Sequence, residues 1–90
     1  MNIVIIGSGG REHALCYKLL KSSKINKIYC IPGNAGTDEI ATNIFADIND
    51  FDEIYKIVLK LNVELIVVGP EIPLVNGIVD YFEKKNIKIF

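Results

Sequence analysis

Short runs of consecutive apolar residues alternate along this chain with segments in which apolar residues recur every three or four positions. Continuous, β-branched apolar runs that end at glycine or proline are typical of parallel strands covered on both faces. The pattern therefore predicts a sheet with buried strands. The runs that we expect to form strands are 2–6, 25–32, 64–69 and 87–90.

Segments in which apolar residues recur at helical spacing separate these strands. It is clearest after Asp50, where Asp50 and Glu53 resemble a capping box and an apolar stripe follows. Asn62 is suited to the left-handed position at the end of this helix. Segment 39–47 is ambiguous, and we expect a short helical turn and then a brief strand over 43–46. The predicted helices are 11–21, 51–61 and 73–85.

The order of these elements predicts the fold class. Strands that alternate with helices form a parallel sheet with right-handed crossovers and helices on both faces, which is a Rossmann-like α/β fold. Ligands of such sheets bind beyond the carboxyl ends of the strands. The segments GSGGREH, PGNAGT and GPEIP each follow a predicted strand, so we expect them to share one edge.

Length and composition narrow the possible functions. Ninety residues fit one domain, and 10 basic against 11 acidic residues leave no positive excess for a nucleic-acid partner. Cys16 and Cys30 have neither metal-ligand nor redox-pair spacing, so we expect reduced core thiols. No apolar run approaches the ~18 residues of a membrane span. We expect a cytoplasmic protein that binds no membrane.

The glycine-rich turn after the first strand is suited to an anion. Gly7, Gly9 and Gly10 allow the backbone to approach a ligand closely, and the start of the next helix offers unpaired N–H groups. Arg11 opposes the helix dipole there, which favours a role in binding a ligand or a carboxylate. The alternatives are a tight strand-to-helix turn and a solvated arginine.

The same turn matches a dinucleotide-binding fingerprint only in part. When G-x-G-x-x-G is aligned on Gly7 and Gly9, Glu12 stands at the third glycine. The acidic residue expected about 20 positions later is missing, because the second strand ends in CIP. A G-K-[ST] ending is also absent. These departures disfavour a site for NAD or for a P-loop nucleotide.

The PGNAGT segment has two interpretations. Gly, Asn and Pro are common in connections of any kind, so one interpretation is a connecting loop alone. If it lies beside the glycine turn, Asn34 and Thr37 are placed to bind hydroxyls or phosphate of the same ligand. A polar ligand of sugar-phosphate size suits these groups.

Three ionisable side chains remain. Glu71 lies between Pro70 and Pro73, and it serves either a ligand or the start of a helix. Glu12 and His13 are adjacent, so they point about 100° apart on a helix and do not form an acid–base pair. We interpret His13 as a structural hydrogen-bonding residue. No catalytic residue and no metal ligands are predicted.

Three ordered motifs, VIIGSGGREHAL, PGNAGT and VVGPEIPLVNGIVD, resemble the amino-terminal domain of the glycinamide ribonucleotide synthetases, or phosphoribosylamine-glycine ligases. The resemblance covers residues 1–90, and only EIATNIFADIND is undistinguished. It implies a pre-ATP-grasp domain of a ligase of purine biosynthesis. Such a ligase uses ATP and magnesium to activate glycine and joins it to 5-phosphoribosylamine. The implied substrate-binding residues are Gly9, Gly10, Arg11, Asn34, Gly36, Thr37 and Glu71.

Members of that family continue past the point where this chain stops. The resemblance therefore implies a domain truncated near its fifth strand, whose partners are the missing ATP-grasp and carboxy-terminal domains that bind ATP and magnesium. Such a fragment would be inactive alone, and its exposed sheet edge would favour association with another copy. The alternatives are a stand-alone NAD- or nucleotide-binding module and a purely structural docking domain.

Overall fold

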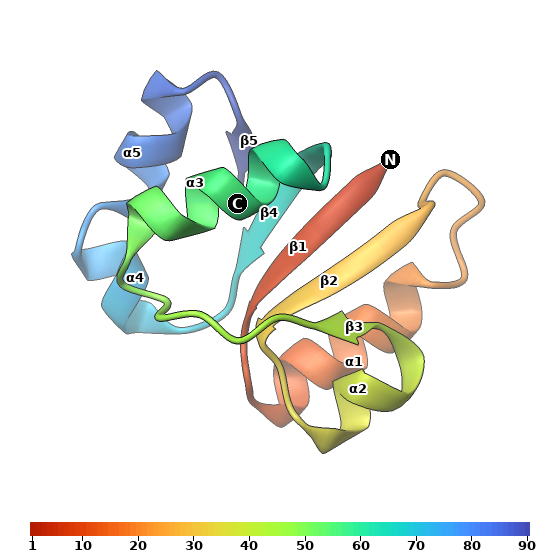
Figure 1. Cartoon of the computed structure of the whole chain (residues 1–90). Helices are drawn as coiled ribbons and strands as arrows, with labels where there is room; N and C mark the ends of the chain where they lie inside the picture. The colour runs from red at the N-terminus through yellow and green to blue at the C-terminus, as the bar shows by residue number, and fades with distance from the viewer.

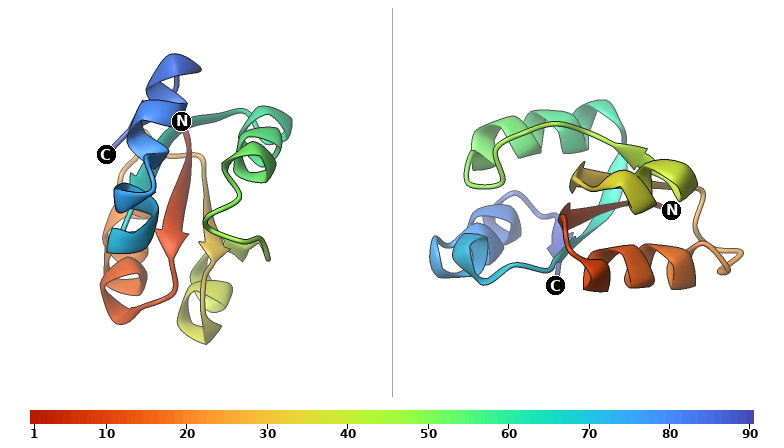
Figure 2. Two further views of the ribbon diagram at one scale, coloured as in Figure 1. Left: turned by 90° about the vertical axis from the view of Figure 1, so that its left-hand side faces the viewer. Right: turned by 90° about the horizontal axis from the view of Figure 1, so that it is seen from below.

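Five parallel strands in the order β3-β2-β1-β4-β5 form the centre of the molecule, with helices on both faces (Figures 1 and 2). A computed structural model describes all 90 residues. The predicted Rossmann-like α/β class is confirmed. The strands are β1 (Asn2–Gly7), β2 (Lys27–Pro32), β3 (Thr42–Asn43), β4 (Val63–Val68) and β5 (Lys88–Ile89). The helices are α1 (Gly10–Leu19), α2 (Ala35–Ile40), α3 (Phe51–Lys60), α4 (Glu71–Val75) and α5 (Ile78–Lys84).

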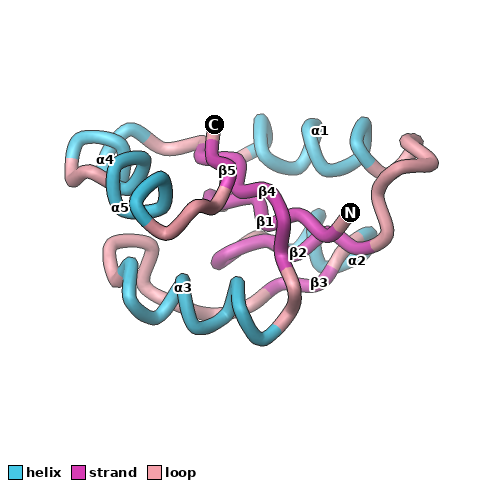
Figure 3. Tube along the Cα trace, turned by 90° about the horizontal axis from the view of Figure 1, so that it is seen from above, coloured by secondary structure: helices cyan, strands magenta, loops and turns pink.

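The central strand β1 explains why its sequence is a continuous apolar run. Val4 and Ile6 face the core beneath α3 and α5, whereas Ile3 and Ile5 face the core beneath α1 and α2. Alternate side chains of a strand point to opposite faces, so a strand covered on both faces is apolar throughout. Figure 3 shows α1 and α3 on opposite sides of the strands.

Helix α3 forms as its local signals predict. The Asp50 carboxylate accepts a hydrogen bond from the N–H of Glu53 at 3.1 Å, which satisfies a free donor in the first turn. Ile54 and Val58 are buried on its inner face. Asn62 adopts the left-handed conformation, with φ 54°, two residues after the last residue of the helix. Start, buried face and end of this helix are therefore all encoded locally.

The predicted helix over 73–85 is wrong, because two short helices occupy that segment. Helix α4 begins at Glu71, and Pro73 is tolerated because N–H groups in the first turn have no partner within a helix. Gly77 has φ 91° and separates α4 from α5. A left-handed glycine ends one helix and allows the next to begin in a new direction.

Two further expectations need correction. PGNAGT is more than a loop, because Asn34 caps helix α2, which begins at Ala35. The brief strand expected over 43–46 instead covers Thr42–Asn43, where it pairs with Tyr29 and Cys30 of β2. No helix of the structure has the length and apolar character needed to cross a membrane.

Candidate functional site

The loops after β1, β2 and β4 meet at the carboxyl edge of the sheet, as the parallel topology predicts (Figure 1). The N–H of Gly33 donates to the carbonyl of Gly7 at 3.1 Å, which joins the first two loops. The N–H of Gly69 donates to the carbonyl of Ile6 at 2.9 Å, which joins the β4 loop to β1. The strand order also reverses here, between β1 and β4. This is the position at which open parallel sheets bind their ligands.

Both polar atoms of the Asn34 side chain form hydrogen bonds within the chain. Its Oδ1 accepts the N–H of Thr37 at 2.9 Å and caps α2. Its Nδ2 donates to the carbonyls of Ser8 at 2.8 Å and Gly9 at 3.3 Å in the β1 loop. The amide of Asn34 therefore fastens two loops together, and its direct contact with a ligand stays a prediction.

Thr37 lies behind Asn34 and is fully buried, with 0% of its surface exposed. Its hydroxyl donates to Oδ1 of Asn43 at 2.7 Å and accepts the N–H of Asn34 at 2.8 Å. Because both hydrogen-bonding roles of the hydroxyl are filled, Thr37 shapes the loop from inside. Thr37 would therefore affect a bound ligand only through the position of Asn34.

Glu12 is the residue whose role the sequence did not indicate. Its side chain is buried at 6% exposure, and its Oε2 accepts the N–H of Gly9 at 3.2 Å. A Cβ added at Gly7 would lie 2.5 Å from Cγ of Glu12, and one at Gly9 would lie 2.9 Å from its Oε2. A Cβ at Gly69 would overlap Oε1 of Glu12. These glycines therefore make room for a carboxylate of the chain itself, where the sequence suggested room for a ligand.

His13 joins helices α1 and α2 by packing. A Cβ added at Gly36 would lie 2.6 Å from Cε1 of the His13 ring, so the close approach of α1 and α2 depends on that glycine. His13 is half-buried, and its ring makes no hydrogen bond within the chain. The expectation of a structural hydrogen bond is therefore corrected to a packing contact. Gly36 serves this contact.

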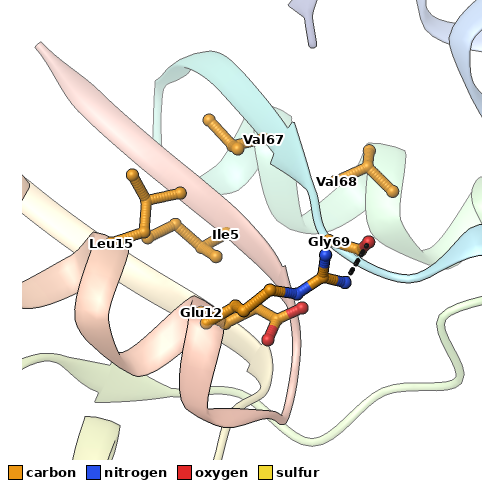
Figure 4. A pocket seen from close by; sticks show the side chains of 7 residues that line it. Ile5, Glu12, Leu15, Val67, Val68 and Gly69 are labelled. Carbon is orange, nitrogen blue, oxygen red and sulfur yellow. Dashed lines mark hydrogen bonds between the residues drawn. The ribbon is translucent and has the colours of Figure 1, made fainter.

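The remaining predicted residues face solvent. Gly10 and Arg11 are exposed at the start of α1, and nothing lies within 4 Å of a Cβ added at Gly10. Nη2 of Arg11 lies 3.5 Å from the carbonyl oxygen of Gly69, as the dashed line in Figure 4 marks. Glu71, two residues after Gly69, is exposed and its side chain makes no hydrogen bond or ion pair within the chain. These three residues form the accessible rim of the edge.

A small surface pocket adjoins this rim. Its volume is about 200 Å³, and it lies between the first turns of α1 and the end of β4 (Figure 4). Arg11, Glu12 and Gly69 form the polar end of the pocket. Its apolar wall consists of Ile5, Leu15, Val67 and Val68.

Comparison with known proteins identifies the family. Residues 1–90 match the family described as "Phosphoribosylglycinamide synthetase, N domain". The chain belongs to this family. The resemblance given by the three sequence motifs is thereby confirmed.

Similar proteins include phosphoribosylamine-glycine ligases of two bacteria. The enzyme of Caldanaerobacter subterraneus subsp. tengcongensis is 42% identical over 90 residues, which is 100% of this chain and 22% of that enzyme. The enzyme of Nostoc sp. is 44% identical over 92 residues, again with 100% of this chain and 22% of that enzyme. The chain thus spans about a fifth of the length of these curated relatives.

A solved structure supports the same assignment. The crystal structure of phosphoribosylamine-glycine ligase from Thermotoga maritima superposes with a TM-score of 0.58 at 32% sequence identity. The match covers 79% of this chain and 16% of that one. The α/β sheet described above is therefore an architecture that this family also has in a crystal.

Proposed function

We propose that this chain is the amino-terminal domain of a ligase that joins glycine to 5-phosphoribosylamine in purine biosynthesis, and that it binds the 5-phosphoribosylamine. The observation that carries the proposal is the family match over all 90 residues, to relatives named phosphoribosylamine-glycine ligases. The convergence of three loops at the carboxyl edge supports a ligand site there.

The accessible rim suits a sugar phosphate. The guanidinium of Arg11 is able to bind a phosphate through two parallel hydrogen bonds, with the N–H of Gly10 as a neighbouring donor. The Glu71 carboxylate is available to ribose hydroxyls or to the amine. Gly9, Asn34, Gly36 and Thr37 support the rim through contacts within the chain.

The glycine turn of this chain is filled by a side chain of the chain itself, so we do not place ATP there. The Glu12 carboxylate fills the space beside the glycine turn, so it blocks the close backbone approach that a dinucleotide pyrophosphate makes in a Rossmann fold. No group of three or more His, Cys, Asp or Glu side chains is placed to hold a metal ion. We assign ATP and magnesium to the ATP-grasp part of the longer ligase, and we expect the 90 residues alone to be inactive.

Packing against that longer ligase is the second part of the proposal. Ile72 is 64% exposed and Val75 is 83% exposed on the short helix α4, directly after Glu71. Apolar side chains gathered beside a site commonly mark an interface. The relatives have nearly four-fifths of their length outside the match, which provides an occupant for this surface.

A purely structural docking domain is the competing function. It is favoured by the internal use of Asn34, Thr37 and Glu12, which stabilise the loops without any ligand. A stand-alone NAD-binding module is disfavoured because Glu12 occupies the position of the third fingerprint glycine.

An amide-resolved NMR titration of the 90-residue chain with ribose 5-phosphate tests the proposal, with inorganic phosphate and NAD as separate controls. We expect saturable shifts at Gly10, Arg11 and Glu71, and weaker shifts with NAD. Arg11→Gln should weaken binding about tenfold or more, since it removes a charged hydrogen-bonding partner of the phosphate. Lys18→Gln, on the same helix, is the matched control and should leave binding unchanged.

The outcomes separate the alternatives. Shifts caused by NAD alone would contradict the ligase assignment of the site. No shift with any of the three compounds would favour the docking domain. Equal weakening by Arg11→Gln and Lys18→Gln would show that positive charge in general, rather than the rim, attracts the phosphate.

A further inference from the structure

The Glu12 carboxylate is enclosed by glycines from two loops that are distant in sequence. Gly7 is the last residue of β1, Gly9 lies in the loop after it, and Gly69 follows β4. At each of these glycines an added Cβ would come within 3 Å of the Glu12 side chain. We call this enclosure, formed by Gly7, Gly9 and Gly69, the glycine slot. A side chain so closely surrounded fixes the separation of the backbones that enclose it.

The position of Glu12 also has an electrostatic reason. Glu12 is the third residue of α1, and its Oε2 accepts the N–H of Gly9, the residue that caps the helix. Negative charge at the start of a helix is stabilised by the helix dipole and by unpaired N–H groups. The chain thus supplies its own anion at the start of α1, and the slot is stable without a bound ligand.

The inward direction of Glu12 determines the direction of Arg11. Successive residues of a helix point about 100° apart. With Glu12 buried in the slot, Arg11 is exposed, and its guanidinium lies over the carbonyl of Gly69. The same slot therefore sets both the distance between the β1 and β4 loops and the place at which Arg11 meets the rim.

We propose that Glu12 is a positioning residue that holds the β1 and β4 loops at the separation required for ligand binding at Arg11 and Glu71. This inference rests on the proposed function for its ligand. Glu12 acts through the glycine slot and does not itself touch the ligand.

Two substitutions in the 90-residue chain test this role. Glu12→Ala removes the acceptor and empties the slot, so we expect the amides of Gly9 and Gly69 to shift and the Kd for ribose 5-phosphate to rise about tenfold or more. Glu12→Gln keeps the shape and one acceptor oxygen, so its Kd should stay within about twofold of the parent value. Glu83→Gln, an exposed residue of α5, is the control and should change neither quantity.

A second pair of variants separates positioning from stability. Gly69→Ala should lower the Tm of the parent chain, because the methyl group would overlap Oε1 of Glu12. In the Glu12→Ala background the same methyl group enters the vacated slot, so Gly69→Ala should be tolerated or should raise the Tm. The double variant lacks the acceptor for Gly9, so its affinity should remain low although its Tm recovers. It also serves as the test if Glu12→Ala alone does not fold.

Two results in a chain that binds ribose 5-phosphate would overturn the proposal. An unchanged Kd in folded Glu12→Ala would show that Glu12 stabilises the fold without positioning the ligand site. Equal weakening by Glu12→Ala and Glu12→Gln would indicate that the charge itself acts on the ligand. Failure of the parent chain to bind ribose 5-phosphate would count against the proposed function alone. In that case unchanged Gly69 amides in Glu12→Ala would still refute the coupling of the loops.

Discussion

The imidazole ring of His13 lies against Gly36 so closely that a single methyl group at Gly36 would come within 2.6 Å of the ring. His13 belongs to α1 and Gly36 to α2, so this contact determines how closely the two helices approach behind the rim. Neither residue stands out in its own segment. Their relationship exists only because both helices cover the same face of the sheet.

This contact predicts that the effect of Gly36→Ala on stability depends on whether the His13 ring is present. Gly36→Ala should destabilise the parent chain by about 1–2 kcal/mol, because the methyl group collides with the ring. In the His13→Ala background the same change should be neutral or stabilising by up to about 1 kcal/mol, since alanine is the better helix former. Urea unfolding of the four variants measures both effects. Gly10→Ala is the control, because nothing lies within 4 Å of its Cβ. Equal destabilisation in both backgrounds would contradict the packing explanation.

Asn34 should contribute more to stability than an asparagine whose side chain makes no hydrogen bond within the chain. Asn34→Ala removes the cap of α2 and both hydrogen bonds to the β1 loop, so we expect a loss of about 1–2 kcal/mol. Asn34→Ser keeps an acceptor that is able to cap α2 and loses the two donors to the β1 loop, so its loss should be smaller. Asn26→Ala, whose side chain makes no hydrogen bond, should stay within about 0.5 kcal/mol. Similar losses for Asn26→Ala and Asn34→Ala would refute the assignment.

Tyr81 gives the chain a pH dependence in the alkaline range. Its hydroxyl donates to the Asp52 carboxylate, and this hydrogen bond, with burial and the Asp52 charge, raises the pKa of Tyr81 to about 12. The folded pKa lies above the ordinary value of 10.0, so the neutral phenol favours the folded state. This contribution is fully present below pH 10 and is lost as the pH rises towards 12.

The tyrosinate absorbance at different pH values measures this effect. Asp52→Asn should move the titration of Tyr81 back towards its ordinary range, and Tyr81→Phe should remove that titration step altogether. Stability curves of the parent and of Tyr81→Phe should converge as the pH rises through this window. Curves that stay parallel from neutral pH to pH 12 would show that the Asp52 hydrogen bond does not stabilise the fold.

The two cysteines should not react in the native protein. Cys16 and Cys30 are free and buried, and burial raises the pKa of both thiols, that of Cys30 to about 12. Because the thiolate is the reactive form, we expect no reaction with a thiol-specific disulfide reagent until the chain unfolds, when both react. Ser8→Cys adds an exposed thiol in the β1 loop and is the positive control. Rapid reaction of the native parent chain would contradict the buried placement.

Much of the fold could be predicted because its signals are local. The apolar run of β1, the Asp50 cap of α3 and the left-handed Asn62 each depend on residues within a few positions, and the structure has all three. The order of strands and helices then restricts the sheet to few topologies. The three motifs were sufficient to indicate the family before any contact was known.

The break at Gly77 shows where local signals fail. Apolar residues on both sides continue a helical spacing, so the pattern predicted one helix over 73–85. A glycine costs only about 1 kcal/mol inside a helix, which does not by itself decide between one helix and two. Tertiary packing decided it, because Ile78 and Phe82 of α5 are buried in the core with β1 and α3.

The candidate site, like the fold, could be predicted only in part from the sequence. The sequence by itself determined which loops follow the strands, and hence that glycines, Arg11, Asn34 and Glu71 would gather at one edge. Only the tertiary structure decided which of them face a ligand and which face one another. Glu12 fills a slot whose far wall, Gly69, is 57 positions away, and the ring of His13 meets Gly36 of another helix. The reason is physical: a glycine allows close approach in any context, and only the folded chain determines what approaches it.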